Sequence, residues 1–129
     1  MELIENKIAR QIVDAALHVH KTLGPGLLES VYEAVLSHEL KKRGFTVEHQ
    51  VVIPVIYESV EIEVGFRADL VVEDKIIIEL KSVDKIHDVH KKQLLTYLKI
   101  SNKHLGFLIN FNESLLKNGI TRIVNDLPE

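Results

Sequence analysis

Two six-residue stretches separated by three polar residues constrain the fold of this chain more than any other feature. They read RADLVV, EDK and IIIELK, and they run from Arg67 to Lys81. If each stretch is a β-strand, its side chains alternate between two faces, and one face of each is wholly apolar. The residues of these apolar faces are Ala68, Leu70, Val72, Ile76, Ile78 and Leu80. The pattern therefore predicts a hairpin whose two apolar faces meet on the core side.

The length of the connecting loop decides which side chains face each other across the hairpin. A three-residue loop pairs Val72 with Ile76 and places Asp69 directly opposite Glu79. A two-residue loop shifts the register by one and mixes the faces, so the pattern favours the three-residue loop. That register brings together two carboxylates, which repel each other.

A divalent cation between these carboxylates would remove the repulsion. Mg²⁺ prefers oxygen ligands, typically one or two carboxylates with waters and phosphate oxygens. Lys81 lies on the same face as Glu79, where it can activate a water and offset phosphate charge. The hairpin thus fits the chemistry of phosphodiester hydrolysis. The alternative interpretation is an edge hairpin with a solvated charged face.

Hydrophobic periodicity changes from helical spacing to alternation near Gly44. The expected elements, in chain order, are helices over 2–23 and 27–43, strands over 45–57, 60–72 and 75–81, a helix over 88–100, a strand over 105–111, a loop over 112–119 and a weak last strand over 120–124. The range 60–72 forms one long strand or two short strands around Gly65. The order α-α-β-β-β-α-β predicts one α+β or α/β domain, residues 1–129, with a central mixed sheet flanked by helices.

Composition limits the kinds of site and environment. The absence of cysteine excludes disulfides and thiolate metal sites, and it is consistent with a cytoplasmic protein. The polar start and the lack of a long apolar run predict neither a signal peptide nor a membrane span. A net charge of −3 argues against duplex binding by bulk charge, but it permits a local basic groove. We interpret His87 and His90 as helix surface rather than zinc ligands, because a structural zinc site needs four well-placed ligands.

Several short motifs, in their order along the chain, resemble those of a known group of nucleases. Asp69 followed by Glu79-Leu80-Lys81, on consecutive strands with a helix on either side, resembles the PD-(D/E)xK nuclease core, with Ala68 in place of the proline. Residues 26–32, GLLESVY, match the G-x-x-E-x-x-Y signature of the GxxExxY family. The segments that follow this family's pattern in order, over residues 4–124, are VHKTLGPGLLESVYE, ELKKRG, RADLVVEDKIIIELKSV, QLLTYLK and GFLINF.

The resemblance implies a set of site residues. Asp69 and Glu79 would bind Mg²⁺ or Mn²⁺ together with the backbone carbonyl of Leu80. Glu29, from the second helix, would be an additional acidic residue of the site, and Lys81 would be the catalytic lysine.

Five further residues are expected to support the site. Gln93 would line it from the following helix, and Tyr97 shares a helix face with Gln93. Tyr32 either orients Glu29 or simply packs, and Arg67 contacts phosphate or satisfies Asp69. His20 falls within the VHKTLG segment and is expected to be structural, although it lies where it could reach the site.

Three functional hypotheses follow. The first is a metal-dependent nuclease that cleaves DNA, or alternatively RNA, and that uses a second copy or a larger partner protein to position its substrate. The second is a weakly active or inactive nuclease-fold module that binds nucleic acid or regulates a partner protein, and the third is a purely structural subunit. Lysines on the predicted helix over 88–100 either hold nucleic-acid phosphates or form a solvated face. These are Lys91, Lys92 and Lys99.

Overall fold

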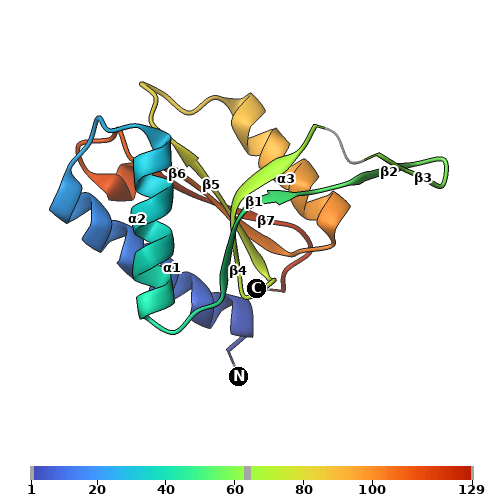
Figure 1. Cartoon of the computed structure of the whole chain (residues 1–129), viewed down its shortest axis with the longest axis horizontal. Coiled ribbons are helices and arrows are strands. Elements are labelled where there is room, and N and C mark those ends of the chain that lie inside the picture. Colours follow the sequence, from blue (N-terminus) through green and yellow to red (C-terminus); the bar gives the residue numbers. More distant parts are fainter. Residues whose placement is uncertain (1, 63–64, 129) are drawn as a thin grey trace.

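A mixed five-stranded sheet forms the centre of the fold, with helices on both faces (Figure 1). The computed structural model describes residues 2–62 and 65–128. The strands, in spatial order, are β1 (Val47–Val52), β4 (Arg67–Val72), β5 (Ile76–Lys81), β6 (Leu105–Asn110) and β7 (Ile120–Val124). Strands β5 and β6 run parallel, whereas the other neighbouring pairs run antiparallel. Parallel neighbours need a crossover connection, and helix α3 (Asp88–Ser101) lies within it.

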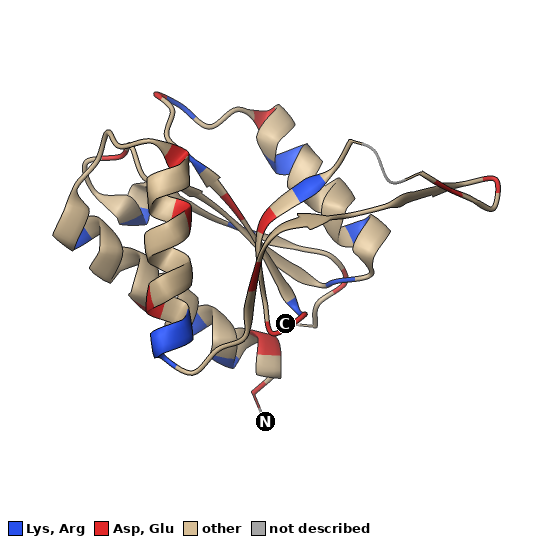
Figure 2. Cartoon of the chain, in the orientation of Figure 1, with Lys and Arg blue, Asp and Glu red and all other residues tan. Residues whose placement is uncertain are grey.

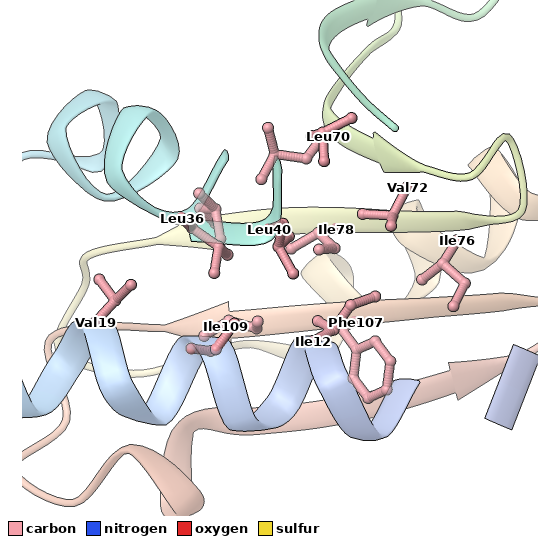
Figure 3. Packing of buried hydrophobic residues seen from close by; sticks show 14 of the residues in the cluster. Ile12, Val19, Leu36, Leu40, Leu70, Val72, Ile76, Ile78, Phe107 and Ile109 are labelled. Atoms are coloured by element: carbon pink, nitrogen blue, oxygen red, sulfur yellow. The ribbon is translucent and has the colours of Figure 1, made fainter. Parts of the chain in front are cut away.

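The larger apolar core lies between one face of the sheet and two helices, α1 (Ile4–Leu23) and α2 (Glu29–Lys42). Both helices present apolar side chains at helical spacing toward the strands, as the sequence predicts. Figure 3 labels side chains from this core: Ile12, Val19, Leu36, Leu40, Leu70, Val72, Ile76, Ile78, Phe107 and Ile109. The predicted apolar faces of β4 and β5 therefore do meet on a core side.

A second apolar cluster covers the opposite face of the sheet, where α3 packs. It includes Val71 and Ile77 from the strands and Leu94 and Leu98 from the helix. Strands β4 and β5 are inner strands with both faces covered, so the alternative of an edge hairpin with a solvated face is wrong. Ala68, expected beside Leu70, packs in this second cluster instead. The alternation of side chains along β4 is therefore interrupted between Ala68 and Leu70. The residue between them, Asp69, has no ladder partner in the described strands.

The expected strand over 45–57 is divided in two. Strand β1 ends at Val52, and β2 (Val55–Tyr57) begins after Pro54, whose nitrogen has no hydrogen to donate to a ladder. Strand β2 pairs with β3 (Val60–Ile62), and this hairpin projects away from the body of the molecule (Figure 1). Two residues with left-handed backbone, Glu58 and Ser59, close its turn.

The remaining boundaries agree closely with the expectation. The range 60–72 forms two strands, β3 and β4, and residues 63–64 of that range lie outside the described residues. The expected loop over 112–119 contains a short 3-10 helix, η1 (Leu116–Gly119), and the weak last strand forms as β7. Within the described ranges, no helix combines the length and hydrophobicity needed to cross a membrane.

Candidate active site

The register of β4 and β5 brings Asp69 and Glu79 together. Val72 pairs with Ile76, which is the pairing that a three-residue loop requires. Continued one residue along the strands, this register places Asp69 opposite Glu79. Glu79 lies on the same face of β5 as Ile77, which packs in the cluster under α3. The Asp69 Oδ2 atom accepts a hydrogen bond of 2.8 Å from the backbone N–H of Leu80. The Asp69 side chain thus spans the two strands where their ladder stops.

Glu79 is the most strongly perturbed acid of this site. It is only 9% exposed, and its Oε1 atom is buried without a hydrogen-bond partner among the described residues. Burial raises the pKa of Glu79 to about 9, the nearby Asp69 carboxylate adds to the rise, and Lys81 opposes it. In the absence of a cation, the Glu79 carboxyl group therefore holds a proton at neutral pH.

The pair of carboxyl groups fits a hard divalent cation. A buried carboxylate oxygen without a partner is costly, and a cation in contact with both acids would satisfy it while offsetting their repulsion. In the part of the chain that the structure describes, no three His, Cys, Asp or Glu side chains converge closely enough to hold an ion alone. Water or phosphate oxygens would therefore have to complete the shell, which is common for Mg²⁺.

The start of α2 is fastened to the end of β5. Glu29, the first residue of α2, accepts a hydrogen bond of 3.3 Å at Oε1 from the backbone N–H of Ser82. The Ser82 hydroxyl donates in turn to the Leu27 carbonyl at 2.7 Å. Ser82 follows Lys81 directly, so the structure brings Glu29 to the strand end that carries Lys81. A pocket lined in part by Glu29, Ser82 and Asp84 opens there.

Helix α3 contributes two side chains, Gln93 and Tyr97, on the side of the sheet opposite to α2. Burial raises the pKa of Tyr97, Glu79 and Asp69 raise it further, and Gln93 beside the Tyr97 hydroxyl opposes this rise. Gln93 and Tyr97 therefore do share a helix face, with Tyr97 near both acids. The carbonyl of Leu80, whose N–H contacts Asp69, stays a predicted metal ligand.

His90 lies nearer the site than the sequence suggests. The sequence pattern predicts that it lies with His87 on solvated helix surface, but His90 is half-buried. Burial lowers the pKa of His90, as does the positive charge of Lys81, whereas Glu29 raises it. Its Nδ1 atom accepts a hydrogen bond of 3.0 Å from the backbone N–H of His87. That contact organises the first turn of α3. It also occupies the Nδ1 lone pair that a zinc ion would need.

Tyr32 and His20 have structural contacts. Tyr32 is fully buried, its ring stacks on Phe111 with centroids 4.3 Å apart, and its hydroxyl donates to the Gly24 carbonyl at 2.6 Å. The same hydroxyl accepts a hydrogen bond from the Leu27 N–H at 3.0 Å. Of the two interpretations of Tyr32, packing is supported, and the residue also holds the turn that precedes Glu29. The His20 Nε2 atom lies 2.8 Å from the Glu113 carbonyl oxygen, which supports the structural role expected for it.

Replacing Tyr32 with phenylalanine is expected to lower the free energy of unfolding by about 1–3 kcal/mol. The substitution keeps the stacked ring but leaves the Gly24 carbonyl and the Leu27 N–H without the partner that the Tyr32 hydroxyl supplies to each. Chemical denaturation measures the effect. The matched control is Tyr57→Phe, because Tyr57 is 64% exposed and its change should stay within about 0.5 kcal/mol. Equal losses in the two variants would contradict a structural role for the Tyr32 hydroxyl.

Basic side chains lie at the start of β4 and along α3. Arg67 begins β4, and its Nη1 atom contacts the Gln50 carbonyl oxygen at 3.5 Å rather than forming an ion pair with Asp69 within the described residues. Figure 2 shows the acidic positions on β4 and β5 and the basic positions along α3. The exposed lysines of that helix are Lys91, Lys92 and Lys99. This placement leaves both interpretations of the lysines open.

Sequence reasoning missed two polar residues close to the site, Gln50 and Asn110. The Gln50 amide nitrogen contacts the carboxylates of both Glu33 and Asp69. Asn110 is fully buried and exchanges hydrogen bonds with the backbone of Val83, shaping the loop after β5. An amide at the end of the apolar run GFLIN was a signal for Asn110, since a buried polar group needs partners. Gln50 gave no such signal, because it sits at an ordinary polar position of an alternating strand.

Comparison with known proteins adds one positive finding. A family model described as the PD-(D/E)XK nuclease superfamily matches residues 6–123. No curated protein and no solved structure matches the chain.

Proposed function

The chain belongs to the PD-(D/E)XK nuclease superfamily, and from this premise we propose that it is a nuclease of the GxxExxY family that hydrolyses phosphodiester bonds in DNA with Mg²⁺ or Mn²⁺. The observation that carries the proposal is the pairing of Asp69 with the buried carboxyl group of Glu79, whose Oε1 atom has no hydrogen-bond partner among the described residues. RNA is the alternative substrate. The lack of cysteine supports a cytoplasmic location.

Each residue has a role that its position supports. Asp69 and Glu79 would hold the cation, with the Leu80 carbonyl and Glu29 at the margin of the site. A bound divalent cation would supply charge that polarises the scissile phosphate and acidifies a water. Lys81, beside Glu79 on β5, would orient or deprotonate the attacking water and offset phosphate charge. Gln93 would hold the water or phosphate from α3.

Substrate binding would use the basic residues at the rim. Lys91, Lys92 and Lys99 are exposed on α3, where they can follow a phosphate backbone, and Arg67 lies at the start of β4. A second copy or a larger protein would position the substrate, because the domain is small. The β2–β3 hairpin supports such an encounter, since Ile56, Tyr57 and Val60 are each more than half exposed.

A cleavage assay tests the proposal. The purified protein is incubated with single-stranded, duplex and branched DNA and with RNA, in Mg²⁺, in Mn²⁺ or in EDTA. We expect cleavage that requires the metal ion and that EDTA abolishes. Absence of cleavage on every substrate, together with metal-dependent nucleic-acid binding in a gel-shift assay, would instead support the second function, a binding module that retains the fold.

A further inference from the structure

One residue within β1, Gln50, has left-handed rather than extended backbone. Its φ angle is 52°, in the left-handed region that side-chain-bearing residues rarely adopt. His49 pairs with Leu70 and Val51 pairs with Ala68, so the register with β4 is the same on either side. The interruption therefore inserts no residue into β1, and it falls directly opposite Asp69. Backbone strain of this kind persists where surrounding contacts fix it, often at functional sites.

The contacts of the Gln50 side chain show what fixes it. Its Nε2 atom donates to Glu33 Oε1 at 2.5 Å and to Asp69 Oδ1 at 3.3 Å. Glu33 lies on α2, one turn after Glu29. The other oxygen of Asp69, Oδ2, accepts the Leu80 N–H at 2.8 Å. Both oxygens of the Asp69 carboxylate therefore have a donor, one from β5 and one from β1.

We propose that Gln50 is a positioning residue that fixes the orientation of the Asp69 carboxylate and separates it from Glu33. The inference rests on the proposed function, in which Asp69 binds the metal ion. An amide group suits this position because its two N–H bonds can serve two carboxylates at once. A glutamate would add a third negative charge, and a lysine would compete with the cation. Substitution of a residue that orients a ligating carboxylate without touching the metal typically lowers metal affinity or activity by about 10–100-fold.

Glycine at position 50 removes the amide while retaining the backbone. Glycine adopts positive φ without strain, so Gln50→Gly should fold and leave the thermal midpoint of the metal-free protein near that of the wild type. Calorimetric titration with Mn²⁺ alone should then show affinity about 10–100-fold weaker than in the wild type. Gln50→Met, which keeps the side-chain length but has no N–H donor and adds no charge, should also bind Mn²⁺ more weakly.

Two controls separate this inference from the function on which it rests. Glu58→Gly changes another left-handed residue (φ 49°) in the turn of the projecting hairpin, and it should leave Mn²⁺ affinity unchanged. Asp69→Ala should abolish Mn²⁺ binding. If Asp69→Ala binds Mn²⁺ as the wild type does, both the proposed function and the role of Gln50 fail. If Asp69→Ala loses binding while both Gln50 variants stay within twofold of the wild type, only the role of Gln50 is overturned.

Discussion

Replacing Lys81 with methionine is expected to lower the rate of nucleic-acid cleavage by about 10²–10⁴-fold, the range associated with loss of a positioned acid–base group. Methionine keeps an unbranched apolar stem of similar length but has no ammonium group. Lys81 lies on β5 beside Glu79, yet it forms no ion pair with any described residue, so its charge is available to a substrate or a water. The measurement is the single-turnover cleavage rate at saturating Mg²⁺.

Two comparisons make the Lys81 result specific. Lys85→Met removes the same charge from an exposed loop residue four positions further on, and it should change the rate by less than about threefold if the effect is not one of net charge. Mn²⁺ binding to Lys81→Met should persist, because both carboxyl groups remain. Cleavage at the wild-type rate by Lys81→Met would mean that the activity arises at another site or from a contaminant.

The sequence was sufficient for the hairpin register because local pattern alone decides it. Only an odd loop puts Leu70 and Val72 on the same side as Ile76, Ile78 and Leu80, and Val72 does pair with Ile76. The helices were also predictable, since their apolar stripes are long. The burial of Glu79 was not, because the same alternating pattern suits a solvated face and a face covered by another helix. Only the packing of α3 against Val71 and Ile77 distinguishes the two.

The residues missed at the site depend on contacts between distant segments. Gln50 looks like any outward-facing polar residue of a strand, and glutamine is not a residue that usually signals left-handed backbone. Its role becomes visible only when α2 brings Glu33 and β4 brings Asp69 to the same place. The sequence likewise predicts a surface position for His90, because its spacing from His87 does not reveal that Lys81 lies nearby in the fold. Spacing in sequence thus located the acids, but not the groups that hold them.

Glu79→Gln is expected to stabilise the metal-free protein at pH 8 by about 2–5 kcal/mol, and to leave its stability at pH 5 nearly unchanged. The pKa of Glu79 is 4.5 in the unfolded reference and about 9 in the fold. Between these values the folded protein holds a proton that the unfolded chain has released, so raising the pH favours unfolding. The slope approaches 1.4 kcal/mol per pH unit, because that is the free energy of one pKa unit. Glutamine removes the titrating group and with it the slope.

Denaturation with urea between pH 5 and pH 9, in EDTA and then in Mg²⁺, measures this effect. Glu39, whose pKa is lowered by its hydrogen bonds to Arg43 and Lys42, loses its contribution only below this window. Glu48→Gln on the exposed side of β1 is the matched control and should keep the wild-type slope.

The response to Mg²⁺ decides between the nuclease and a purely structural subunit. A structural subunit also gains stability from Glu79→Gln, because the repulsion with Asp69 is lost, but its stability is insensitive to Mg²⁺. In a metal-dependent nuclease, Mg²⁺ should restore the stability of the wild type at pH 8, since the cation binds the ionised form of Glu79. It should do little for Glu79→Gln. If the stability of the wild type at pH 8 is the same in Mg²⁺ and in EDTA, Asp69 and Glu79 do not bind the cation, and the result supports a purely structural subunit.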